Sequence, residues 1–152
     1  GAASRGRVPG RGRRALSLKP MPMTDGPGRR RNSLLACLAF LRKSAPQITM
    51  SEMLVFLYVA ENAGIRIKEL SELMGTTPAT ASRAARALVS RGDLGALPPG
   101  LGWLVMASND REKISRHLYL TPLGVAIVQR LDTLIGRAQL IGTAEAPSFR
   151  VV

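Results

Sequence analysis

The stretch TPATASRAARALVSRG, residues 77–92, decides the fold of this chain. Thr77 can cap a helix, Pro78 suits its first position and Gly92 suits the residue beyond its last turn, so the pattern predicts a helix from Pro78 to Arg91. At helical spacing the inward positions are Ala81, Ala84, Ala85 and Leu88. Because three of these four are alanine, the helix must pack closely on its neighbour, as the second helix of a helix-turn-helix does.

Three further helices are predicted ahead of this stretch. Apolar residues dominate 32–44, which predicts a first helix that is apolar on most faces and therefore buried against a neighbour. Thr49-Met50-Ser51-Glu52 fits a capping box, and a second helix is expected to follow it to about Ala63. A short extended piece, 65–67, then leads into a third helix that ends at Met74. These helices and the 78–91 helix place the chain in a mainly α class.

The pattern changes after the 78–91 helix. Residues 97–102 are rich in proline and glycine and predict a loop. Trp103–Ser108 and Lys113–Leu120 predict two strands around a polar turn at 109–112, so a small β-hairpin wing is expected. Thr121-Pro122 starts a last helix. Its expected apolar stripe is Leu123, Ile127, Val128, Leu131, Leu134 and Ile135. Compact helices followed by a two-stranded ribbon predict a winged helix-turn-helix.

The residues from Ile48 to Gly136 resemble the MarR-type winged-helix regulators. The matching pieces are Ile48–Met53, Ile67–Gly75, Thr77–Arg83, Asn109–Glu112 and Leu120–Gly124, in that order. The resemblance implies a homodimer that binds double-stranded DNA, and a small-molecule effector in the cleft between the dimer helices and the DNA-binding lobe. Two departures stand out: Arg66 replaces a usual Ser or Thr cap, and the usual C-terminal pair of dimerisation helices is reduced to one helix and a tail.

Candidate DNA-contacting residues follow from the inward stripe, because it fixes which face of the 78–91 helix points outward. Arg83 or Arg86 can bind guanine through two hydrogen bonds, Ser82 can bond a base or a phosphate, and the Ala79 methyl can contact thymine. The start of the helix, with Thr77, Pro78 and Thr80, is expected to attract a phosphate. The alternative is that both arginines only solvate an exposed face.

The predicted wing tip adds two basic residues, Arg111 and Lys113, to this candidate site. By resemblance, Arg111 is the wing arginine expected to enter the minor groove, where narrow A·T-rich stretches concentrate negative potential. Asp110 or Glu112 can hold its guanidinium in place. The alternative is an ordinary polar turn.

Positive charge is concentrated at the N-terminus. Residues 1–31 hold nine Arg or Lys residues and one acid, a net +8 of the total +12. This predicts a flexible basic arm (1–31), a winged helix-turn-helix domain with dimerisation helices (32–139) and a C-terminal tail (140–152). Such an arm suits a polyanion, either nucleic acid or an anionic membrane. The alternative is a leader without a partner, the true start being Met21 or Met23.

Nothing in the sequence favours an enzyme. His117 is the only histidine, so no His-Cys metal cluster and no histidine-based triad is expected within one chain, and no cofactor is predicted. Cys37, the only cysteine, lies in an apolar run and is expected to be an inert core residue rather than a redox switch. The apolar runs are too short to cross a bilayer, and a reducing cytoplasm is the expected setting.

Three functions therefore remain open. A dimeric sequence-specific transcriptional regulator, expected to be a repressor, accounts for the 78–91 helix and the wing. A replication or nucleoid accessory protein that binds nucleic acid without sequence preference would account for the basic arm. A winged helix used only for protein contacts is the third, since a fold does not fix a function.

Overall fold

Five helices and three short strands make up residues 31–108 and 116–142, the part of the chain that the computed structural model describes. In chain order they are α1 (Ser33–Ser44), α2 (Met50–Glu61), β1 (Ile65–Arg66), α3 (Ile67–Met74), α4 (Pro78–Ala87), β2 (Leu104–Ala107), β3 (His117–Leu120) and α5 (Pro122–Gly136). The strands form one antiparallel sheet in the order β1-β3-β2. This arrangement confirms the predicted winged helix-turn-helix class.

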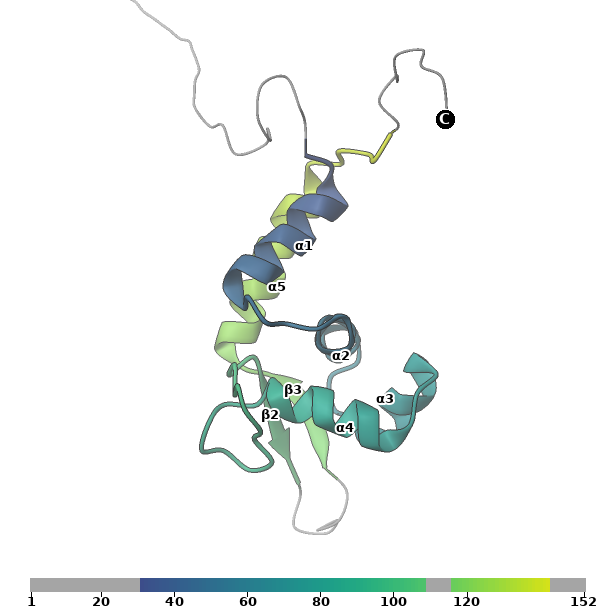
Figure 1. Cartoon of the computed structure of the whole chain (residues 1–152), viewed down its shortest axis with the longest axis vertical. Coiled ribbons are helices and arrows are strands. Elements are labelled where there is room, and N and C mark those ends of the chain that lie inside the picture. The colour runs from purple at the N-terminus through teal and green to yellow at the C-terminus, as the bar shows by residue number, and fades with distance from the viewer. Residues whose placement is uncertain (1–30, 109–115, 143–152) are drawn as a thin grey trace, which may run out of the picture.

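The molecule has a winged lobe and an upper helical pair (Figure 1). In the winged lobe, α2, α3 and α4 pack beside the sheet, and the rings of Phe56 and Trp103 meet edge to face with centroids 5.0 Å apart. In the upper pair, α1 and α5 lie side by side. Ser33 joins their ends, because its amide donates to the Gln139 carbonyl at 2.8 Å and its hydroxyl accepts from the Gln139 amide at 2.9 Å.

The predicted helix starts are confirmed by their caps. The Thr49 hydroxyl accepts from the Glu52 amide at 3.1 Å while the Glu52 carboxylate accepts from the Thr49 amide at 3.0 Å, a complete capping box. Thr77 and Thr121 cap α4 and α5, and each is followed by a proline at the first helical position. Local hydrogen-bonding chemistry thus places the start of each of these helices.

The predicted end of α4 was wrong: the helix ends at Ala87 and not at Arg91. The Leu88 carbonyl accepts from the Leu104 amide at 3.0 Å, and Val89 pairs with Leu104 in a parallel β-bridge. Val89 is fully buried in the process. The chain leaves the helix because its last carbonyls and an apolar side chain find partners in the sheet, which the helical pattern alone does not reveal.

The alanine stripe of α4 is buried as predicted: Ala81, Ala84, Ala85 and Leu88 are all in the core. It lets α4 pack closely on α2 and α3. The apolar stripe of α5 is confirmed only in part. Ile127, Leu131 and Leu134 are buried, but Leu123 is 51% exposed and Ile135 57% exposed.

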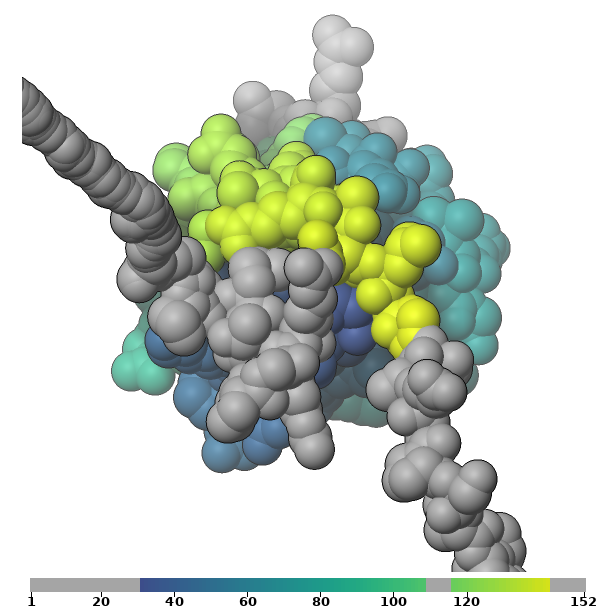
Figure 2. Space-filling model, turned by 90° about the horizontal axis from the view of Figure 1, so that it is seen from above, coloured from purple at the N-terminus to yellow at the C-terminus, as the bar shows by residue number. Residues whose placement is uncertain are grey.

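The first helix was predicted to be apolar on most faces and buried against a neighbour, and within one chain one side of it is buried. Leu34 is 55% exposed and Leu35 44% exposed, while Ala36 and Leu41 are buried against the rest of the fold. Helix α5 is the main neighbour of α1. Seen from above, the C-terminal end of α5 lies at the surface beside α1 (Figure 2).

The predicted hairpin is present and has one strand more than expected. Strand β3 pairs with β2 on one side and with β1 on the other, in registers that set Met106 and Ile65 opposite Leu118. The turn predicted at 109–112 and the beginning of the second predicted strand lie outside the described residues. No helix among the described residues is long and apolar enough to cross a membrane.

Candidate nucleic-acid interface

Helix α4 presents its predicted outward face to the surface. Ala79 and Arg83 are exposed, and Ser82 is half-buried. In the described chain the Arg83 guanidinium makes no hydrogen bond or ion pair, so all of its donors can reach a ligand. Because the opposite face of α4 is sealed in the core, this exposed face is rigidly oriented. It can do what base recognition requires, which is to hold a forked donor at a fixed place.

Arg86 lies one turn further along α4 and has different surroundings. It is half-buried, and its Nε donates to the Gly95 carbonyl at 2.8 Å. This bond ties the loop that follows α4 to the helix face. Arg86 therefore has a structural partner that Arg83 lacks, and its role as a reader of bases stays a prediction.

The N-terminus of α4 offers fewer free amides than a typical helix start. Pro78 has no N–H group, the Thr80 amide donates to the Thr77 hydroxyl at 3.2 Å, and the Ala81 amide donates to the Thr77 carbonyl at 3.0 Å. Among the first four residues, this leaves the amide of Ala79 for a phosphate. The Thr77 and Thr80 hydroxyls are also bonded to each other at 3.0 Å.

The two wing residues predicted to contact DNA, Arg111 and Lys113, lie outside the described residues. On either side of this segment, β2 ends at Ala107 and β3 begins at His117. Both strands lie below α2 and next to α4 (Figure 1). The predicted contacts of Arg111 and Lys113 remain predictions.

A charged groove, of about 700 Å³, lies between α4, the start of α3 and the base of the wing. We call it the charged groove. Its lining side chains are Arg66, Ile67, Lys68, Glu69, Glu72, Ser82, Arg86, Met106 and Arg116. Ser82 and Arg86 belong to the predicted DNA-contacting face, so the groove continues that face toward the sheet.

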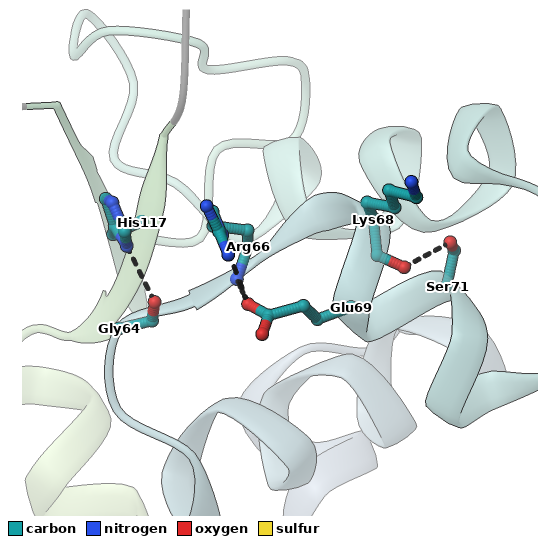
Figure 3. A network of polar contacts seen from close by, with 6 residues as sticks. All are labelled: Gly64, Arg66, Lys68, Glu69, Ser71 and His117. Atoms are coloured by element: carbon teal, nitrogen blue, oxygen red, sulfur yellow. Dashed lines mark hydrogen bonds and ion pairs between the residues drawn. The ribbon is translucent and has the colours of Figure 1, made fainter. Parts of the chain in front are cut away.

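Arg66, Lys68 and Arg116 were not among the predicted site residues. They come from β1, from the first turn of α3 and from the residue before β3, and the pairing of β1 with β3 brings Arg116 to the other two. The one hint in the sequence was Arg66 at a position where a Ser or Thr cap is usual in the family that the chain resembles. Arg66 and Lys68 extend toward the same side of the chain in Figure 3.

Glu69 compensates for the missing cap at the start of α3. Its carboxylate accepts from the Arg66 amide at 3.0 Å and from Arg66 Nε at 3.4 Å (Figure 3). These backbone and side-chain hydrogen bonds hold the pKa of Glu69 below its usual value, and the nearby charges of Arg66 and His117 act in the same direction. Glu69 thus stays ionised beside the cations of the groove.

Cys37 and His117, the residues considered for redox or metal chemistry, have surroundings that suit a structural role. Burial, and then the charge of Asp132, raise the pKa of Cys37, which disfavours the reactive thiolate. His117 Nδ1 lies 2.8 Å from the Gly64 carbonyl, a bond that links β3 to the turn before β1. Among the described residues no group of three His, Cys, Asp or Glu side chains could hold a metal ion.

Comparisons with known proteins find the fold but no close relative. No model of a known protein family matches the chain, and no curated protein does. Among solved structures, the MarR protein from Peptoclostridium difficile is 16% identical with a TM-score of 0.50, over 66% of this chain and 59% of that one. RV1404 from Mycobacterium tuberculosis is 17% identical with a TM-score of 0.53, over 68% of this chain and 67% of that one. The chain therefore spans less than two thirds of the first of these proteins, and it shares the winged-helix fold of a MarR protein.

Proposed function

We propose that this winged-helix chain is a transcriptional regulator that binds double-stranded DNA in a sequence-specific way, as a repressor. The observation that carries the proposal is that α4 has one buried face and one exposed face. Its alanine face is sealed in the core, while Arg83 and Ala79 stand exposed on the opposite face. A helix held in this way suits insertion into the major groove, where a free arginine discriminates guanine by about 1–3 kcal/mol.

The proposal includes a homodimer built on α1 and α5. Leu34, Leu35 and Ile135 are large apolar side chains, each more than 40% exposed on this helical pair, and Leu140 and Ile141 just beyond α5 are 87% and 67% exposed. A second copy that covers them would remove apolar surface from water. A two-fold dimer would present two α4 helices, so the preferred site would be an inverted repeat with half-sites about one helical turn apart.

The experiment that tests the proposed function is a selection of genomic DNA. Fragments bound by the full chain at physiological salt are sequenced, and the affinity for an enriched duplex is compared with the affinity for a scrambled duplex of equal length by fluorescence anisotropy. We expect an enriched inverted repeat that is bound at least 10³-fold more tightly than the scrambled duplex, the range found for specific DNA-binding proteins. Enrichment without a shared sequence would contradict the proposal.

A second candidate function is favoured by the +8 charge of residues 1–31. An accessory protein that binds DNA through this segment alone would need no base contacts. Removing residues 1–31 separates the two functions. A regulator should lose affinity for every duplex but should still bind the enriched duplex more tightly than the scrambled one, by the same ratio. An accessory protein should lose nearly all binding, and the full chain should already bind both duplexes equally.

A further inference from the structure

The charged groove brings four cations from three parts of the chain to the edge of the predicted DNA-contacting face. Arg66 lies on β1, Lys68 on α3, Arg86 on α4 and Arg116 directly before β3. Glu69 and Glu72 also line it, so the groove keeps an excess of two positive charges. Four cations spread along a groove suit an extended anion with several negative charges, such as a phosphodiester strand, better than one compact ion.

The cations of the groove differ in how far they are already engaged. The Lys68 and Arg116 side chains make no hydrogen bond or ion pair within the described ranges. Arg66 shares only its Nε with Glu69, and Arg86 shares only its Nε with Gly95. The terminal nitrogens of both guanidinium groups therefore keep their donors.

The position of the groove identifies its occupant. Its walls are α4 on one side, through Ser82, and the base of the wing on the other, through Met106 and Arg116. If α4 enters the major groove and the wing reaches the minor groove, the sugar-phosphate strand that separates those two grooves must pass between them. That passage is the charged groove.

We infer that the charged groove binds the phosphodiester strand between the major and minor grooves, through Arg66, Lys68 and Arg116, and that Glu69 limits its strength. This inference rests on the proposed function and adds residues to it. Phosphate contacts fix the register of a protein on the duplex and carry no sequence information. The groove therefore sets the position of α4 while Arg83 reads the bases.

Salt dependence of duplex binding tests the inference, because each phosphate contact releases a condensed counterion. The slope of log K against log salt falls by about 0.9 for each contact that is lost. We expect Lys68→Gln and Arg116→Gln each to reduce the slope by about 1, and the double variant by about 2, with an unchanged ratio of enriched to scrambled binding. Arg42→Gln and Arg130→Gln are matched controls, since they remove the same charge from exposed positions on α1 and α5.

A second variant tests the role of Glu69 in the opposite direction. Glu69→Gln retains an oxygen that can accept from the Arg66 amide but removes the charge that competes with phosphate for Arg66. We expect tighter binding to every duplex, by several-fold at physiological salt, and a steeper slope. Circular dichroism and thermal unfolding of each variant check that the fold is kept.

The outcomes separate this inference from the proposed function. If the salt slopes of the groove variants match those of the Arg42 and Arg130 controls, the inference is overturned. The proposed function still stands in that case if the ratio of enriched to scrambled binding depends on Arg83. Groove variants that change the ratio would also overturn it, because the residues would then contact bases. If the unaltered chain binds no duplex at low salt, both fail.

Discussion

Arg83 and Arg86 lie three residues apart on the same helix, and the fold gives them different surroundings. Both fall on the face opposite the alanine stripe, so spacing alone treats them alike. In the structure Arg83 is exposed and unbonded, while Arg86 donates to the Gly95 carbonyl at 2.8 Å. Helical periodicity predicts a face, but it cannot predict that a loop nine residues later returns to occupy one of the two side chains.

The low reactivity expected of Cys37 could be predicted from the sequence, because an apolar neighbourhood disfavours the charged thiolate. The raised pKa leaves little thiolate at neutral pH, and the fraction grows only as the pH rises toward that pKa. We expect Ellman's reagent to modify Cys37 several-fold more slowly than glutathione at pH 7, and the rate to rise with pH. Cys37→Ser should leave duplex affinity unchanged. Rapid modification at pH 7 that releases DNA would contradict this account.

At the scale of elements, the starts of α4 and α5 are encoded locally, and the end of α4 is not. Thr77 and Thr121 each act within three residues of their own position, so the pattern of a cap followed by a proline predicted the starts of α4 and α5 correctly. The end of α4 depends on Leu104, a residue of another element. The extended piece at 65–67 was predicted, but its pairing with β3 and the charged groove were not, because both depend on contacts between distant parts of the chain.

Gly124, near the start of α5, is required by a close approach of two elements. A Cβ at this position would lie 2.3 Å from the Trp103 carbonyl oxygen, which accepts from the Thr121 amide at 3.1 Å. Gly124→Ala should therefore lower the free energy of unfolding by about 1–3 kcal/mol, as overpacking does. Denaturant unfolding measures it.

Gly136 provides the control for that substitution. It lies at the other end of α5, and a Cβ there would meet nothing within 4 Å. Gly136→Ala should be neutral or stabilise the fold by up to about 1 kcal/mol, because alanine loses less backbone entropy in a helix. Equal destabilisation by both substitutions would show that the contact with Trp103 is not the cause.

At the scale of the whole molecule, the resemblance predicted the winged lobe well and the upper helical pair less completely. The winged lobe has a core of its own, in which Val55, Phe56, Leu70 and Leu118 are fully buried, although Leu57 and Leu73 are exposed on its surface. The pair α1 and α5 leaves Leu35 and Ile135 in water. A sequence pattern marks such residues as apolar but cannot say whether their own chain or a second copy covers them.

Two substitutions on the helical pair test the dimer. Leu35→Glu and Ile135→Glu would each place a charge in the proposed interface twice, since a two-fold interface repeats every residue. We expect the dimer dissociation constant, measured by sedimentation, to rise at least about 10-fold, because an unpaired buried charge costs several kcal/mol. Leu57→Glu, on the exposed face of α2, is the matched control. An unchanged dimer in all three variants, or a monomeric unaltered chain, would contradict the proposed assembly.

The measurement that tests the central claim most directly is the sequence preference of Arg83→Ala. Anisotropy gives its affinity for an enriched and for a scrambled duplex, with Arg42→Ala as the control that loses the same charge. The account predicts that Arg83→Ala loses preference by roughly 5- to 150-fold, the equivalent of about 1–3 kcal/mol, while the control keeps the preference of the unaltered chain. An undiminished preference in Arg83→Ala would show that α4 does not read DNA through this residue.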